Sequence, residues 1–118
     1  MKEHPHVLSA SSISSDRVKN PAGEDLGTIE DLMVDLNSGR IAYAVLSFGG
    51  WLGMGSKLFA IPWDSLTVDT ADKSILLNVS KETLQNAPGF DPDNWPDMTD
   101  PSWGANVYSH YGVTPYWF

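Results

Sequence analysis

Residues 26–48 read LGTIEDLMVDLNSGRIAYAVLSF, and the pattern of this stretch decides the fold. Its middle, the turn sequence NSG at residues 37–39, separates two apolar stretches and offers a glycine for the left-handed backbone position of a short hairpin loop. In the first stretch Leu32, Val34 and Leu36 fall on one face, because side chains alternate along a strand. We therefore expect two antiparallel strands, the first of them half buried.

The second stretch, residues 41–48, is apolar on both of its faces. A strand of this kind is covered on both sides, for example by a barrel interior and by a further layer. The outer face of this strand is therefore a candidate docking surface, and Tyr43 and Val45 are its candidate interface residues.

Outside this hairpin, short apolar stretches continue to alternate with turns, which is typical of an all-β protein with short strands. The further stretches lie at residues 57–63, 66–70 and 75–79, and turn sequences lie at residues 21–23 and 71–74. The chain has 118 residues, 42% of them hydrophobic, which is enough for one core. We expect a small β-barrel of five or six strands at residues 11–80, after a flexible N-terminus at residues 1–10.

Residues 81–118 are expected to form a helical, aromatic and proline-rich extension that packs on the barrel. Its first part is a short helix at residues 81–87, because Ser80 is a suitable N-cap and Pro88 and Gly89 stop the helix. The barrel is therefore followed by one or two short helices.

The second helix is expected within residues 88–118, which contain eight aromatic residues, four aspartates and no lysine or arginine. Asp100 can cap this helix, Pro101 suits its first position, and Gly112 can end it. One face carries an apolar stripe with a spacing of four residues, made of Trp103, Val107 and Tyr111. We expect this stripe to contact the barrel, with docking on a partner as the alternative.

Charge and composition exclude several classes of function. The formal net charge is −8, which repels phosphate backbones and argues against nucleic-acid binding. The absence of cysteine excludes disulfides, thiolate catalysis and cysteine-based metal sites. We find no signal-peptide pattern and no apolar run long enough to cross a bilayer, so we expect a cytoplasmic protein with no transmembrane segment.

Residues 50–57 read GWLGMGSK and superficially resemble a phosphate-binding loop, but here the lysine follows the serine and a strand comes next instead of a helix. Trp51, Leu52 and Met54 are large apolar side chains on a segment too rich in glycine to bury them by itself. Aromatic and methionine side chains displayed together are typical of interface centres. The loop folds onto its own barrel, forms a homodimer contact or receives a different protein.

The sequence offers neither a metal site nor a catalytic constellation. Asp31 and Asp35 share a strand face, but at about 3.3 Å per residue they lie roughly 13 Å apart, too far for one metal. His4 and His6 belong to the N-terminal tail, and His110 has no recognisable nucleophile or orienting group. We therefore expect no metal, no cofactor and no enzyme activity.

Several runs of the sequence resemble the PRC-barrel family. In the barrel region these runs are LGTIEDLMVD at residues 26–35, GRIAYAVLS at 39–47 and AIPWDSL at 60–66. The tail is similar to that of stand-alone bacterial members, with NAPGF at residues 86–90, NWP at 94–96 and YW at 116–117. The resemblance extends over almost the whole chain and implies a small β-barrel.

PRC-barrels are known from the cytoplasmic part of the photosynthetic reaction-centre H subunit and from the C-terminal domain of the small-subunit ribosome maturation factor. Both proteins use the barrel to dock on protein. This sequence carries neither the transmembrane helix of the first nor the additional N-terminal domain of the second. The resemblance therefore implies protein docking in general.

Together these observations favour a non-enzymatic protein-binding or assembly module. We expect it to self-associate as a homodimer, or to dock on another protein, through the outer face of residues 41–48 and the loop that holds Trp51. The alternative is a small-molecule binding protein with an apolar site between barrel and tail, walled by Trp95, Trp103 and Tyr108.

Overall fold

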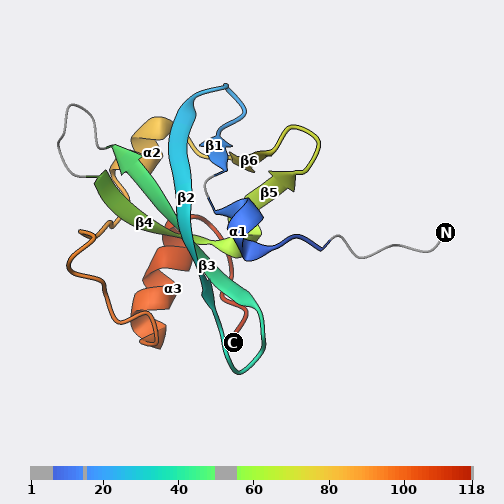
Figure 1. The fold of residues 1–118 in the computed structure, drawn as a ribbon. Helices are drawn as coiled ribbons and strands as arrows, with labels where there is room; N and C mark the ends of the chain where they lie inside the picture. The colour runs from blue at the N-terminus through green and yellow to red at the C-terminus, as the bar shows by residue number, and fades with distance from the viewer. Residues whose placement is uncertain (1–6, 15, 50–55, 118) are drawn as a thin grey trace.

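The computed structural model describes residues 7–14, 16–49 and 56–117 of the chain. Its strands form one six-stranded sheet in the order β4-β3-β2-β1-β6-β5, which curls strongly into a half-barrel (Figure 1). The strands are β1 Arg17–Lys19, β2 Asp25–Val34, β3 Ile41–Gly49, β4 Ser56–Pro62, β5 Leu66–Asp69 and β6 Ser74–Leu77. The prediction of a small, mainly β barrel followed by short helices is confirmed.

The helices are short and begin at polar caps. They are α1 Ala10–Ile13, the 3-10 turn η2 Trp63–Ser65, α2 Lys81–Gln85 and α3 Pro101–His110. As expected, the Ser80 side chain accepts a hydrogen bond from the first turn of α2, and the Asp100 side chain does the same for α3. Helix α1 was not predicted, since its four residues are too few for a periodic pattern.

The central hairpin is antiparallel, as predicted. Its loop is closed by the Asp35 amide, which donates to the Arg40 carbonyl oxygen at 2.7 Å. Gly39 occupies the left-handed region with φ +75°, the conformation for which a glycine was expected. The residues between these two ends form the exposed tip of the hairpin.

The predicted inward face of β2 is wrong at its C-terminal end. Val34 is 53% exposed and Leu36 is 92% exposed. The register against β3 shifts between Ile29 and Asp31 and again between Met33 and Val34. Each such irregularity breaks the two-residue alternation on which the prediction rested, and Leu36 lies in the turn beyond the strand.

Strand β1 joins the two halves of the sheet, because it pairs antiparallel with β2 and parallel with β6. The close approach of β2 to β3 depends on Gly27, which has φ +111°. A Cβ atom at this position would overlap the carbonyl oxygen of Ser47 on β3. Glycine is therefore required for this crossing of strands.

Two apolar clusters lie on opposite sides of β3. The larger cluster fills the curled sheet, and Ala44 and Leu46 contribute to it from β3. The second lies between the sheet and α3, and its buried members are Tyr43, Ala60, Val107 and Tyr108. The expectation that β3 is covered on both faces is thus confirmed, and the chain itself supplies the outer cover (Figure 1).

Candidate functional site

Aromatic side chains fix the C-terminal segment on the outer face of the sheet. The rings of Trp103 and Tyr108 meet Tyr43 edge-on, with centroids at 5.3 and 5.6 Å. Tyr108 is 1% exposed, and its hydroxyl donates to the Ala42 carbonyl oxygen at 2.8 Å. Edge-to-face pairs of this kind add to the free energy of burial, so α3 is firmly seated.

Gly104 allows α3 to approach the strand. A Cβ atom here would overlap the hydroxyl of Tyr43 and lie 2.9 Å from the ring of Trp117. Trp117 in turn packs edge-on against Tyr108 at 4.9 Å between centroids. The helix, the strand and the chain end therefore meet at one glycine.

The tail extends along the sheet edge before it reaches α3. Phe90 and Leu58 exchange two backbone hydrogen bonds, of 2.9 and 2.8 Å, which place the tail beside β4. Trp95 stacks against Phe90 at 5.1 Å, and its indole nitrogen donates to the Pro92 carbonyl oxygen at 2.8 Å. These contacts lead the chain around the edge of the sheet.

The candidate interface residues of the sequence have two different fates. Tyr43 and Val45 are only 3% and 0% exposed, because the fold covers them, so in this structure they offer no surface to a partner. Trp51, Leu52 and Met54 lie outside the described residues. They belong to the stretch that joins the paired ends of β3 and β4.

The three residues of the predicted tail stripe lie within the chain's own packing. Val107 is buried, and Trp103 and Tyr111 are partly buried against the cluster between sheet and helix. Tyr111 also touches the larger cluster. Burial raises the pKa of the Tyr111 phenol above its ordinary value.

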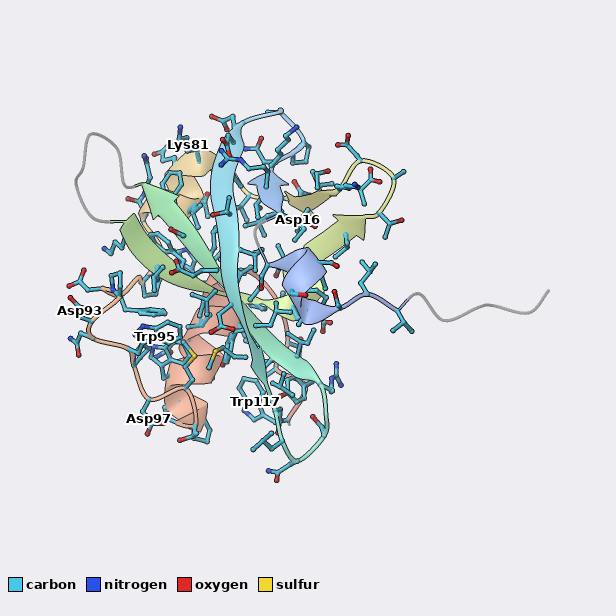
Figure 2. The ribbon with its side chains drawn as sticks, in the orientation of Figure 1. Asp16, Lys81, Asp93, Trp95, Asp97 and Trp117 are labelled. Atoms are coloured by element: carbon cyan, nitrogen blue, oxygen red, sulfur yellow. The ribbon has the colours of Figure 1, made fainter. Side chains whose placement is uncertain are left out.

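A groove that the sequence did not predict lies between the tip of the β2–β3 hairpin and the C-terminal segment. Its volume is about 530 Å³, and Trp117 stands on its tail side, close to the hairpin (Figure 2). The lining residues are Met33–Asn37, Ala42, Tyr43, Met98–Pro101, Tyr116 and Trp117. Because Val34 and Leu36 belong to this lining and are exposed, the groove borders an apolar surface.

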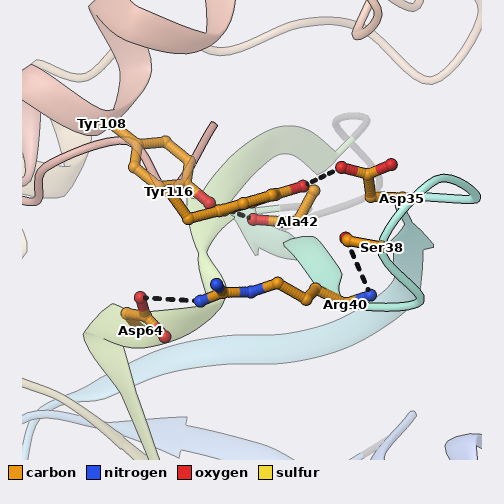
Figure 3. Close-up of polar contacts among 7 residues, drawn as sticks. All are labelled: Asp35, Ser38, Arg40, Ala42, Asp64, Tyr108 and Tyr116. Carbon is orange, nitrogen blue, oxygen red and sulfur yellow. Dashed lines mark hydrogen bonds and ion pairs between the residues drawn. The ribbon is translucent and has the colours of Figure 1, made fainter. Parts of the chain in front are cut away.

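A polar cluster ties the hairpin to the chain end (Figure 3). The Tyr116 hydroxyl donates to the Asp35 carboxylate at 2.5 Å, and the Arg40 guanidinium lies 4.3 Å from the centre of the Tyr116 ring. Arg40 also approaches the Asp64 carboxylate at 3.9 Å. The hydrogen bond from Tyr116 holds the pKa of Asp35 below its usual value, while burial and the Asp35 contact raise the pKa of Tyr116.

No residue type in the sequence announced this cluster, because its members come from distant parts of the chain. Asp35 was identified only as an exposed carboxylate, and Tyr116 only as part of an aromatic tail. A second, smaller hollow of about 310 Å³ lies beside Arg40 and Asp64. Tyr108 lines it, but Trp95 and Trp103 line neither hollow, so the three predicted walls of a ligand site do not surround one cavity.

Within the described residues, no group of three or more potential metal ligands gathers. His110 lies 3.3 Å from the Thr83 carbonyl oxygen through its Nε2 atom and packs against the Tyr111 ring. In the same part of the chain, no helix has the length and hydropathy needed to cross a membrane.

Comparison with known proteins adds a family and one structural likeness. The PRC-barrel domain family matches residues 5–84. A 16S ribosomal RNA processing protein, RimM, from Pseudomonas aeruginosa has a similar solved structure, with 14% sequence identity and a TM-score of 0.43 over 64% of this chain. The likeness covers 45% of RimM, so the chain spans less than half of that protein's length. No curated protein gives a significant match.

Proposed function

The chain belongs to the PRC-barrel domain family, and from this premise we propose that it is a non-enzymatic module for protein binding or assembly. Membership of the family supports such a role in general. PRC-barrel domains are not known as enzymes, and the side chains around the groove include no nucleophile paired with a base. The net charge of −8 argues further against a nucleic-acid partner.

The observation that carries the proposal is the exposed apolar rim of the groove. Val34 and Leu36 stand on the hairpin tip, next to a concave surface lined by methionine and aromatic side chains. Apolar side chains that cluster at a groove, instead of lying singly on the surface, are typical of protein interaction sites. The outer face of β3 is unsuited to this role, since α3 already covers it.

Self-association is the more specific part of the proposal, and it rests on sequence. Trp51, Leu52 and Met54 lie close together in a glycine-rich stretch, and such residues are enriched at the centres of interfaces. We place the homodimer contact at these three residues. We place the protein in the cytoplasm, a reducing compartment that suits a chain without cysteine.

Two experiments test the function. Light scattering coupled to gel filtration, over a range of concentrations, should give a dimer for the wild type and a monomer for Leu52→Asp. Affinity capture from a lysate of the source cell, with the wild type and a Trp51→Ala, Leu52→Asp double variant, tests for a different protein. A monomer at all concentrations that captures nothing above background would refute the proposal.

A small apolar ligand is the second candidate, and the groove is the observation in its favour. Its volume of about 530 Å³ lies in the range of small-molecule sites, and it lies between barrel and tail, as the alternative hypothesis required. A thermal-shift screen against metabolites, pigments and quinones tests this candidate. Stabilisation that is lost in Tyr43→Ala, but kept in Leu52→Asp, would support it.

A further inference from the structure

We propose that the groove between the β2–β3 hairpin and the C-terminal segment binds a polypeptide segment of a partner protein in which an apolar side chain is flanked by lysine or arginine. This inference rests on the proposed function and deepens it, because it assigns both the surface and the chemistry of the partner. It concerns a surface different from residues 50–55, to which we assign self-association.

The shape and lining of the groove favour an apolar anchor. Met33 and Tyr43 come from the sheet, and Met98 and Trp117 come from the tail, so the anchor would lie between two independent walls. Methionine adapts to side chains of different shapes, and aromatic rings provide large contact areas. A leucine, methionine or aromatic side chain of the partner fits these walls.

The exposed hairpin tip favours a polypeptide over a small molecule. Leu36 is 92% exposed and Val34 is 53% exposed, so most of their apolar surface stands outside the hollow. A small molecule within the groove would leave this surface in water. A peptide that continues past the groove across the tip would bury both side chains, which gives the hydrophobic effect more area.

Charge decides the flanking residues of the partner. Among the residues that line the groove, Asp35 and Asp100 are acidic and none is lysine, arginine or histidine. The tail wall arises from residues 91–100, which hold four aspartates and no basic residue. Arg40 is the nearest cation described, but it lies over the Tyr116 ring and faces Asp64.

The two carboxylates of the groove can accept further hydrogen bonds. Asp35 already accepts from Tyr116 and from the Asn37 amide, and Asp100 accepts from the Ser102 amide. A carboxylate has about four acceptor sites, so each can also receive a charged donor. Lysine or arginine beside the apolar anchor would complement this field and speed association.

Selection from a phage-displayed library of random short peptides on the immobilised wild-type protein tests the inference. The selected peptides are then synthesised, and their affinities are measured by fluorescence anisotropy. We expect peptides with a leucine, methionine or aromatic residue flanked by lysine or arginine. Their affinity should fall about tenfold or more in Leu36→Ser, because the anchor surface at the tip is lost.

Substitutions of opposite charge at one site separate the apolar term from the electrostatic term. Leu36→Lys and Leu36→Glu lose the same apolar contact, but the lysine variant should bind more weakly, since it repels a basic peptide. Asp100→Asn keeps a good helix cap and should weaken binding about threefold, as expected for an exposed charge pair. Val7→Ser is the matched control, because Val7 is 83% exposed and does not line the groove.

The outcomes distinguish this inference from the proposed function. Selected peptides that are acidic or uncharged, that bind Leu36→Glu more weakly than Leu36→Lys, or that are insensitive to both changes would overturn the inference. Peptides lost only in the Trp51→Ala, Leu52→Asp variant would also overturn it, while leaving a protein-binding function in place. If no peptide is retained and the protein neither dimerises nor captures a partner, both proposals fail.

Discussion

At the scale of single residues, Gly27 is the position where the fold tolerates least. It combines φ +111° with a site at which a Cβ atom would overlap the Ser47 carbonyl oxygen. The obstacle is backbone inside a paired strand, so it cannot rotate away as a side chain would. Both the backbone strain and the overlap therefore act against any larger residue.

We predict that Gly27→Ala lowers the free energy of unfolding by about 3 kcal/mol or more. Equilibrium unfolding in urea measures this change. Gly39→Ala is the matched control, because Gly39 has φ +75° but nothing within 4 Å of its Cβ position. It should lose only about 1–2 kcal/mol, the typical penalty for a left-handed residue, and equal losses in the two variants would contradict the overlap argument.

Tyr43 gives a prediction for alkaline pH. Burial raises its pKa from the ordinary value of 10.0 to about 12. Above pH 10 the phenol ionises in the unfolded chain but stays protonated in the folded one, so protons leave on unfolding. Its contribution to stability is therefore complete below pH 10 and is lost as the pH rises towards 12.

Urea unfolding between about pH 9 and about pH 12 should show a falling free energy of unfolding. The decline should be shallower in Tyr43→Phe, which cannot ionise at this position. It should not vanish, because burial also raises the pKa of Tyr108 and of Tyr111. An unchanged decline in Tyr43→Phe would mean that this phenol is not protected in the folded state.

At the scale of secondary-structure elements, α3 and its seat on the sheet form the most specific contact. Gly104 lies where a Cβ atom would meet the Tyr43 hydroxyl and the Trp117 ring. In an isolated helix, alanine would be about 1 kcal/mol better than glycine. Here the lack of space outweighs this propensity, since overpacking typically costs about 1–3 kcal/mol.

We therefore predict that Gly104→Ala destabilises the protein by about 1–2 kcal/mol and increases amide hydrogen exchange in α3. Asn106→Ala is the control, because Asn106 lies on the exposed side of the same helix and gains propensity without a clash. A stabilised Gly104→Ala variant would show that α3 is not held against Tyr43 as the structure indicates. In the double variant with Tyr43→Phe, part of the lost stability should return.

The elements also mark the limit of sequence reasoning. Local signals were sufficient for α3, because Asp100, Pro101 and Gly112 act within a few residues of the helix ends. They were insufficient for the end of β2, where two register shifts against β3 expose Val34. A β-bulge depends on how two strands pair, and the alternation within one strand contains no record of it.

At the scale of the whole molecule, the resemblance predicted the barrel, but the candidate site needed the structure. Apolar patterning on both faces of β3 correctly required a cover, yet it could not tell a partner from the chain's own helix. The groove brings residues near position 35 together with residues near positions 100 and 116. No local pattern encodes such a contact, because each side chain has an ordinary role within its own segment.

Net charge couples the two proposed interactions to salt in opposite directions. Two copies that associate each carry a formal charge of −8, so their mutual repulsion weakens the dimer. Salt screens this repulsion, with a screening length of about 10 Å at about 0.1 M. Binding of a basic segment at the acidic groove relies on attraction, which salt screens in the same way.

We predict that raising the sodium chloride concentration from about 0.05 M to about 0.5 M strengthens self-association and weakens binding of the basic apolar peptide. Sedimentation equilibrium measures the first effect, and fluorescence anisotropy with Leu52→Asp, which should be monomeric, measures the second without interference from the dimer. If both affinities change in the same direction, the two interactions share one surface or one dominant force. Opposite changes are expected only if like charges meet in the dimer and unlike charges meet at the groove.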